Sequence, residues 1–320
     1  MEVRKAVITA AGRGVRLFPV ADPVQKAMLP IVDLDGLTKP VIQIIAEEAL
    51  AAGIEDICVV CTPGDEQKYL SQFEALRANL LAVHKGADWA RAEAERITKL
   101  LRCLHFTVQQ EPRGYGHAVH CAREFVGDAP FLLLLGDHLY VSHVPGVRCA
   151  QQLLQLAARE ACSVAAVQAT REHSISRYGT LTGRRLPEPP GVYQIERIIE
   201  KPSVSQAELE LLTPGLRAGH YLCFFGMHAL TPQVFELLEA AQGKTAGADL
   251  PLTPTLQELA RRAKYLALEV AGRRYDITTK FGLPRAQLAL ALAGQDRERV
   301  LTVITEALAE DGLSRGAVKG

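Results

Sequence analysis

The apolar positions of this chain fall into short runs that alternate with segments of helical periodicity through residue 170. Short runs without interspersed polar residues are typical of strands buried on both faces. Such strands are predicted at residues 6–9, 57–62, 106–109, 131–135 and 163–169. Helices are predicted from Pro40 to Gly53 and at 67–81, 89–104, 117–124 and 151–160. This alternation of strand and helix predicts βαβ units and therefore a parallel sheet.

The pattern changes after residue 170, where strands are joined by turns rich in proline and glycine. Strands are predicted at 178–182, 193–199, 221–225 and 266–270, and helices at 232–241 and 253–262. The hairpin-like spacing predicts a smaller mixed or antiparallel layer. From Pro284 onward the pattern is helical, in two segments that split near Gly294. We therefore expect one domain over residues 1–290, with parts at 1–170 and 171–290, and a helical extension at 291–320.

The chain has 320 residues, and its 36 Lys and Arg balance its 36 Asp and Glu. This balance argues against a general nucleic-acid or membrane-surface binder, which needs a basic excess. No apolar stretch approaches the ~20 residues of a membrane span, and the charged N-terminus lacks a signal peptide's apolar core. Cys58 and Cys61 are predicted to be buried thiols rather than zinc ligands, because a second ligand pair is missing from the sequence. An odd cysteine count without a disulfide framework suggests a cytoplasmic protein.

Residues 5–30 combine an apolar run with two glycines and several cations. Gly12 and Gly14 would let backbone N–H groups approach phosphate oxygens, because no Cβ stands in the way. Arg16 and Lys26 would balance the charge of those phosphates. The segment therefore predicts a phosphate-binding loop, although a tight surface turn after a strand would show the same spacing.

Two carboxylates follow predicted strands. Asp137 comes directly after the apolar run at 131–135, and Asp276 follows the strand at 266–270 and the Arg274-Tyr275 pair. Ligands of parallel sheets bind at the carboxyl ends of the strands, and Mg²⁺ takes one or two carboxylates together with substrate phosphates. Each Asp could also serve only a turn or an ion pair.

Cations beside turns extend this picture. Arg16, Lys26 and Lys201 lie on or next to loops, and their convergence on a Mg²⁺ site would be typical of phosphoryl transfer. The sequence has no Walker motif and no G-x-G-x-x-G, which argues against a P-loop kinase and a dinucleotide-binding dehydrogenase. It also has no G-x-S-x-G and no H-E-x-x-H. His117 is interpreted as a helix-terminal histidine whose ring is satisfied.

Seven segments follow one another in the order of a known family. They read A-A-G-R-G-V-R-L-F-P, P-V-Q-K-A-M-L-P-I-V-D, Q-E-P-R-G-Y-G-H-A-V, L-L-G-D, R-Y-G-T, I-E-K-P and R-R-Y-D-I-T-T-K-F-G. Each segment alone is weakly specific, whereas the ordered set over residues 3–290 is strongly specific. The chain therefore resembles the bacterial UTP–glucose-1-phosphate uridylyltransferases, within the sugar-1-phosphate nucleotidylyltransferases.

This resemblance implies an α/β fold of Rossmann-like, glycosyltransferase-A-like type. A mixed, mostly parallel sheet would be flanked by helices, with a small β-rich sugar-binding part and C-terminal helices. Residues 1–290 would form the nucleotidyltransferase domain, binding the nucleotide through 1–170 and the sugar phosphate through 171–290. The implied reaction is Mg²⁺-dependent: an oxygen of glucose 1-phosphate attacks the α-phosphorus of UTP, and pyrophosphate leaves. A homodimer or homotetramer is the favoured assembly.

The resemblance also implies roles for individual residues. Arg16 would contact the β- and γ-phosphates, Lys26 the α-phosphate, and Asp137 would hold Mg²⁺ with Asp276 as a second ligand. The residues implied to contact the nucleotide base and its loop are Ala10, Ala11, Gly12, Gly14, Gln109 and Gly114. The residues implied to bind the sugar phosphate are His138, Gly179, Glu200 and Lys201.

The chain departs from the family's usual pattern at several positions. Val15 stands in place of Thr, Ala27 in place of Glu, His138 in place of a second Asp, and Thr278 in place of Gly. A turn-like insert at residues 34–39 is also unusual. These departures leave open a paralogue that uses another hexose 1-phosphate or dTTP, or a weakly active regulatory protein that binds nucleotide sugars.

Overall fold

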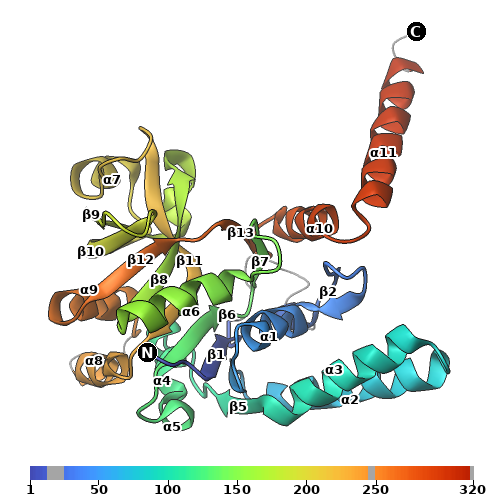
Figure 1. The fold of residues 1–320 in the computed structure, drawn as a ribbon, viewed down its shortest axis with the longest axis horizontal. Helices are drawn as coiled ribbons and strands as arrows, with labels where there is room; N and C mark the ends of the chain where they lie inside the picture. The colour runs from blue at the N-terminus through green and yellow to red at the C-terminus, as the bar shows by residue number, and fades with distance from the viewer. Residues whose placement is uncertain (13–24, 244–248, 318–320) are drawn as a thin grey trace.

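A computed structural model describes the fold of residues 1–12, 25–243 and 249–317. A nine-stranded sheet, in the order β5-β4-β1-β6-β11-β8-β12-β10-β9, runs through it (Figure 1). Its parallel core consists of β1 (Lys5–Thr9), β4 (Asp56–Cys61), β5 (Leu104–Val108) and β6 (Phe131–Leu135). The parallel sheet predicted from the apolar runs is therefore present, and β1 lies near its centre.

The remaining strands of this sheet make it mixed. They are β8 (Ser163–Arg171), β9 (Gly179–Arg185), β10 (Val192–Glu200), β11 (His220–Leu230) and β12 (Tyr265–Glu269). The long strand β11 is antiparallel to both β6 and β8, whereas β12 is parallel to β8. The predicted smaller β layer is thus part of the same sheet as the parallel strands, because β11 pairs with β6 on one side and with β8 on the other.

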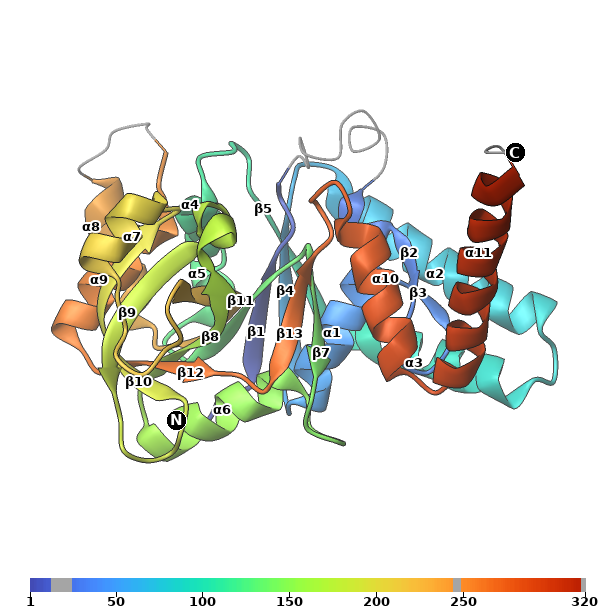
Figure 2. The same ribbon diagram turned by 90° about the horizontal axis from the view of Figure 1, so that it is seen from above.

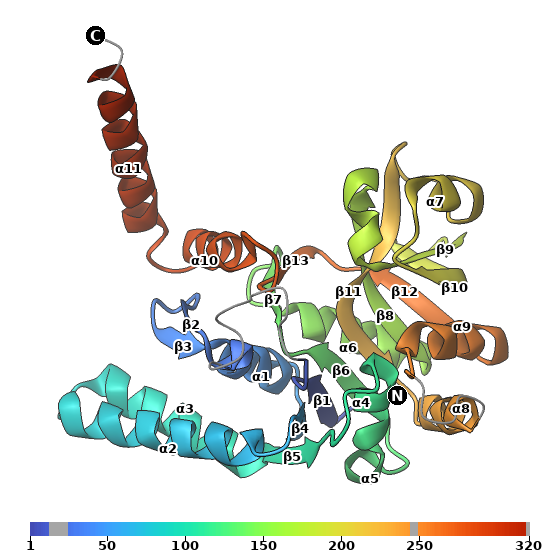
Figure 3. The same ribbon diagram turned by 180° about the vertical axis from the view of Figure 1, so that it is seen from behind.

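Side chains of alternate residues in each strand enter opposite cores, as the period-2 geometry of a strand requires. Ala6 and Ile8 belong to one apolar cluster, with α1 (Val41–Ala51) and α6 (Cys149–Glu160). Val7 belongs to the other cluster, on the opposite face. The helices on that face are α4 (Tyr115–Cys121), α5 (Arg123–Val126), α8 (Gln233–Gln242) and α9 (Leu252–Arg262) (Figure 3). Apolar runs without alternation therefore do mark strands covered on both sides.

Two helical pieces extend from the body. Helices α2 (Asp65–Val83) and α3 (Asp88–Cys103) form a long hairpin at one end (Figures 1 and 3). Helix α10 (Gly282–Ala293) packs near the hairpin of β2 (Pro30–Val32) and β3 (Thr38–Pro40), and α11 (Arg297–Ala317) projects away from the sheet (Figure 2). Short helical elements complete the order: η2 (Lys26–Met28), η3 (Glu172–Arg177) and α7 (Val204–Glu210).

Two strands at the site were not predicted. No strand was predicted at either position, but His138–Ser142 forms β7, which pairs antiparallel with β13 (Gly272–Asp276). The predicted helix over 117–124 also differs, since α4 starts at Tyr115 and ends at Cys121. The central residues of β7, Leu139 to Val141, are buried and apolar, but their partner strand lies far along the chain.

The insert at 34–39 connects β2 to β3 and carries a buried lysine. Lys39 Nζ contacts carboxylate oxygens of Asp33 at 2.8 Å, Asp35 at 2.9 Å and Glu47 at 2.8 Å. Its side chain is only 2% exposed. Three carboxylates thereby compensate one ammonium group that has lost its water, which ties the insert to α1.

Cysteine burial agrees with the prediction. Cys58 and Cys61 lie in β4 as free, buried thiols, and burial raises their pKa to about 11 and about 12. Among the described helices, none has the length and apolar character needed to cross a membrane.

Candidate active site

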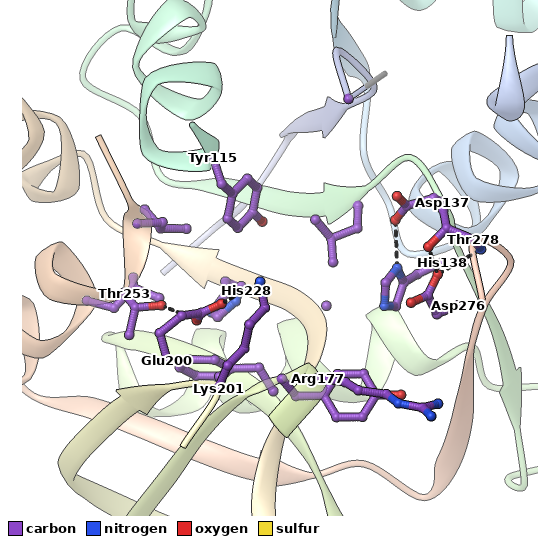
Figure 4. Close-up of a pocket in the computed structure, with 18 of the residues that line it drawn as sticks. Tyr115, Asp137, His138, Arg177, Glu200, Lys201, His228, Thr253, Asp276 and Thr278 are labelled. Atoms are coloured by element: carbon purple, nitrogen blue, oxygen red, sulfur yellow. Dashed lines mark hydrogen bonds and ion pairs between the residues drawn. The ribbon is translucent and has the colours of Figure 1, made fainter. Parts of the chain in front are cut away.

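A cavity of about 370 Å³ opens beyond the carboxyl ends of β1 and β6 (Figure 4). Its wall includes Gly12 and Lys26 from the start of the chain and Asp137 from the end of β6. Glu200 and Lys201, at the end of β10, line the other side. The fold thus brings together predicted residues from both parts of the chain, at the edge where parallel sheets bind their ligands.

The β7–β13 pairing assembles a group of possible metal ligands. Its register sets His138 directly opposite Asp276, and Asp137 comes immediately before His138. Ligand atoms of these three residues all lie within 4.8 Å of one another. The backbone N–H of Ile277 donates to the Asp137 carbonyl at 3.1 Å and extends the ladder by one bond. Backbone geometry, rather than flexible side chains, therefore brings the three residues together.

Thr278 fixes the orientation of Asp276. Its backbone N–H donates to Asp276 Oδ1 at 2.8 Å, and its hydroxyl donates to the same oxygen at 2.5 Å. A glycine at position 278 could supply only the first of these bonds. The departure at Thr278 thus adds a side-chain bond that holds the carboxylate toward the cavity.

Asp137 accepts two bonds from basic groups. Lys26 Nζ lies 2.5 Å from Asp137 Oδ2, and His138 Nδ1 lies 2.8 Å from Asp137 Oδ1. Burial acts to raise the pKa of the Asp137 carboxyl, but His138 and Lys26 outweigh it and hold the pKa well below its usual value. A Cβ at Gly12 would lie 3.2 Å from Lys26 Nζ, so the glycine leaves room for the ammonium group.

Of the described residues predicted to contact the base, Gly12 lines the cavity, whereas Ala10, Ala11, Gln109 and Gly114 lie at neighbouring strand and loop ends outside its wall. Ala10 and Ala11 follow β1 and are buried, and the Ala10 N–H donates to Val60 O at 2.8 Å. Gln109 follows β5, and its backbone N–H donates to Cys61 O at 2.8 Å. Both segments are therefore anchored on the end of β4. Gly14, Val15 and Arg16 lie outside the described residues.

Gln109 is held by the turn that starts α4. Its Nε2 donates to Gly114 O at 3.2 Å and lies 2.9 Å from His117 Nδ1. Gly114 adopts φ +92°, a conformation that favours glycine. Burial, reinforced by nearby Arg113, lowers the pKa of His117, so a neutral ring can accept from Gln109. The satisfied ring of His117 agrees with its interpretation as a structural histidine.

Three of the four predicted sugar-phosphate residues lie together at one end of the β9–β10 pair. Gly179 and Glu200 are paired across β9 and β10, and Lys201 follows with φ +47°. A Cβ at Gly179 would lie 2.7 Å from Phe224 Cδ2 and 3.1 Å from Glu200 Oε2, so only glycine fits beside this carboxylate. Lys201 Nζ lies 3.5 Å from Glu200 Oε1. The fourth residue of this set, His138, lies instead beside Asp137 and Asp276, across the cavity from Glu200 and Lys201 (Figure 4).

The polar residues of the cavity wall that sequence reasoning missed include Tyr115, Arg177, His228 and Thr253. Arg177 belongs to the R-Y-G-T segment, which was a usable signal. Thr253 Oγ1 donates to Glu200 Oε2 at 2.6 Å. His228 is buried in β11, with Nδ1 2.8 Å from the Tyr265 hydroxyl, and burial lowers its pKa to about 3. Neither Thr253 nor His228 stands out from the helical or apolar pattern around it.

The fold and the site define a class of protein. The chain belongs to the nucleotidyl transferase family, whose model matches residues 5–277. Among its relatives, UTP–glucose-1-phosphate uridylyltransferase of Bacillus subtilis (strain 168) is 36% identical over 304 residues, covering 93% of each chain. The enzyme of the same name from Streptococcus pneumoniae serotype 4 is 37% identical over 295 residues, covering 91% of each chain. The predicted resemblance is thereby confirmed.

Solved structures agree with this assignment. UDP-glucose pyrophosphorylase from Acinetobacter baumannii aligns with a TM-score of 0.78 at 25% identity, covering 96% of this chain and all of that one. A UDP-glucose pyrophosphorylase complexed with UDP-glucose aligns with a TM-score of 0.70 at 28% identity, covering 90% of this chain and 98% of the other. The predicted mixed α/β nucleotidyltransferase fold is confirmed.

Proposed function

We propose that this chain transfers a uridylyl group from UTP to glucose 1-phosphate, giving UDP-glucose and pyrophosphate. One observation carries the proposal: a single cavity is lined by Lys26 and Asp137 on one side and by Glu200 and Lys201 on the other. A lysine on each side of the cavity suits a reaction in which two substrates that carry phosphate groups bind next to each other. Relatives that are 36% and 37% identical carry the same activity in their names.

Lys26 is the residue we assign to the α-phosphate. Its ammonium group lies in the cavity wall near Gly12, where the predicted phosphate-binding loop begins. A phosphate oxygen would bind the same ammonium group, either together with Asp137 or in its place. A cation at this position offsets the charge that develops on the α-phosphate and the leaving pyrophosphate.

Mg²⁺ is the cofactor we propose, held by Asp137 and Asp276. The residues fit the ion, because both carboxylates line the cavity, their oxygens lie within 4.8 Å of each other and of a ring nitrogen of His138, and Thr278 orients Asp276. Hard oxygen ligands suit Mg²⁺, which also takes ligands from substrate phosphates. When bound, the ion would neutralise phosphate charge during transfer.

Glu200 and Lys201 are assigned to glucose 1-phosphate. The Glu200 carboxylate, held by Thr253 and open to the cavity, can accept hydrogen bonds from sugar hydroxyls. The Lys201 side chain is 48% exposed, so its ammonium group can approach the sugar phosphate. Gln109 remains our candidate for reading the uracil edge, since its amide is already oriented by Gly114 and His117.

An activity matrix tests this proposal. The purified protein is incubated with MgCl₂, with UTP or dTTP, and with several hexose 1-phosphates, and pyrophosphate release is measured. UTP with glucose 1-phosphate should be the best pair. Product from dTTP or another sugar alone would shift the assignment to a paralogue, and no product from any pair would overturn it.

An alanine pair tests the role of the carboxylate. Asp137→Ala should abolish turnover, whereas Asp128→Ala, at a side chain 93% exposed, should leave it unchanged. Circular dichroism confirms that both variants fold. Wild-type turnover in Asp137→Ala would remove Asp137 from the site.

We also infer a homodimer or homotetramer that works in the cytoplasm. The projecting helix α11 exposes Val303 at 58% and Leu308 at 70%, which favours a second chain against it (Figure 2). Free buried thiols suit a reducing compartment. Light scattering of the wild type and of Leu308→Glu measures the assembly: a monomeric wild type would refute it. Cell fractionation tests the compartment.

A further inference from the structure

His138 was predicted to bind the sugar phosphate, but the structure places it beside the two proposed metal-binding carboxylates. It lies at the start of β7, is 8% exposed, and lines the cavity beside Asp137 and Asp276 (Figure 4). We propose that His138 is a nitrogen ligand of the divalent metal ion, and that it shifts the metal preference of the site from Mg²⁺ toward Mn²⁺ and Co²⁺. This inference rests on the proposed function, because it concerns the same site.

The distances already suit an ion. Ligands about 2.1 Å from an octahedral ion lie about 3.0 Å apart when adjacent and about 4.2 Å apart when opposite. His138 Nδ1 and Asp137 Oδ1 are 2.8 Å apart, and the atoms of all three residues lie within 4.8 Å. A metal ion can therefore replace the hydrogen bond between His138 and Asp137 with small side-chain movements.

The imidazole is also held in place by the fold. The β7–β13 register sets His138 opposite Asp276. Gly226 approaches the ring closely: a Cβ there would lie 3.3 Å from His138 Cδ2, and Gly226 has φ +89°. The neighbouring Tyr140 hydroxyl donates to Gly226 O at 3.0 Å and fixes that backbone. A ring confined in this way is preorganised as a ligand.

Donor chemistry determines the preference. The affinity of a site that contains nitrogen rises along the divalent first-row metals from Mn²⁺ to Co²⁺, whereas Mg²⁺ prefers oxygen ligands alone. A neutral imidazole also removes one negative charge compared with the Asp usual at this position in the resembling family. A site with two carboxylates and one imidazole should thus lose more affinity for Mg²⁺ than for Mn²⁺ or Co²⁺.

The competing role is that of a positioning residue, in which His138 only orients Asp137 through its hydrogen bond. A spectroscopic test separates the two, because only a ligand couples its nitrogen to the ion. Mn²⁺ is added to the nucleotide-free protein, and electron spin echo modulation records coupling to ¹⁴N. The variants are His138→Asp and His138→Gln, with His105→Gln at an exposed ring as the matched control.

We expect nitrogen coupling in the wild type and in His105→Gln, and its loss in both His138 variants. Competition titrations should show that His138→Asp lowers the ratio of Co²⁺ to Mg²⁺ affinity at least ten-fold. Thermal melts establish folding, and His138→Gln keeps the test open if the Asp variant does not fold. Bound Mn²⁺ without nitrogen coupling, or an unchanged affinity ratio, overturns the inference.

These outcomes are independent of the reaction. Mn²⁺ bound without nitrogen coupling, together with active uridylyl transfer, overturns the role of His138 and leaves the proposed function standing. Nitrogen coupling in a protein that forms no product supports the ligand role and overturns the proposed reaction.

Discussion

Thr253→Val changes one bond to a residue that we assign to the sugar. Thr253 Oγ1 donates to Glu200 Oε2 at 2.6 Å, from the first turn of α9. Valine keeps the shape of the side chain but cannot donate. Glu200 would then lose the group that holds its carboxylate toward the cavity, while Lys26 and Asp137 on the opposite side stay unchanged.

The expected magnitude follows from the exposure of this pair. A hydrogen bond to a charged acceptor contributes about 1.5–3 kcal/mol to stability when it is shielded from water. The Glu200 side chain is 46% exposed, so water replaces part of the lost bond. We take about 1 kcal/mol as the net cost, which corresponds to about a five-fold change in affinity. KM for glucose 1-phosphate should therefore rise about five-fold, with kcat and KM for UTP within about two-fold.

Thr255→Val in the same helix is the matched control. Thr255 is buried, and its hydroxyl has no hydrogen-bond partner among the described residues. Replacing this hydroxyl removes an unsatisfied group, so KM should stay constant and the melting temperature should stay equal or rise. Steady-state kinetics with each substrate varied in turn measures all three proteins. An unchanged KM for glucose 1-phosphate in Thr253→Val, or an equal rise for UTP, would refute the reasoning.

Three further predictions concern the framework of the site. Lys39→Met should lower the free energy of unfolding, measured in urea, by about 3–5 kcal/mol, because it leaves buried carboxylates uncompensated. The control Lys68→Met, in an exposed ion pair, should lower it by less than about 1 kcal/mol. Equal effects of the two substitutions would contradict the role of burial. Gly116→Ala should lower the melting temperature, because its Cβ would lie 2.7 Å from a backbone carbonyl oxygen. The control Gly243→Ala should not lower it, because the nearest atom is 3.7 Å away. Equal melting temperatures of the two variants would exclude the clash. The pKa of His228 is about 3 in the folded state, so its contribution to stability is present above the unfolded pKa of about 6.5 and falls by about 2 kcal/mol from pH 7 to pH 5. In urea titrations, the free energy of unfolding of His228→Gln should therefore change less with pH than that of the wild type. An identical pH dependence would exclude His228 as the cause.

Much of the parallel sheet was predictable from sequence, because most of its strands contain a short uninterrupted run of apolar residues. The run F-L-L-L-L has no polar position, and β6 occupies the predicted residues, Phe131–Leu135. A strand end pointed to Asp137, loops and turns pointed to Lys26 and Lys201, and the family resemblance added Glu200; one cavity does bring these four together. Their individual roles stay predictions, because contacts with substrate depend on molecules that the chain alone does not specify.

Other features depend on contacts between distant segments. Strand β7 gains its partner from β13, far along the chain, so its short apolar run carried no reliable local signal. The neighbourhood of His138 follows from that pairing and not from its sequence position. Thr253 and Thr255 look alike in the sequence, yet one meets Glu200 and the other meets no polar partner among the described residues. Only the packing of α9 against β10 distinguishes them.

The β7–β13 ladder also affects when the site can exist during synthesis. Strands β1, β4 and β6 can pair early, because their residues leave the ribosome in the first half of the chain. Asp276 emerges only near the end, so a nascent chain has Asp137 and His138 but lacks the facing carboxylate. Domains generally fold as units as the chain emerges. A truncated translation product that stops before β13 would therefore retain much of the sheet but lack one of the proposed metal ligands, so only the complete chain could perform the proposed reaction.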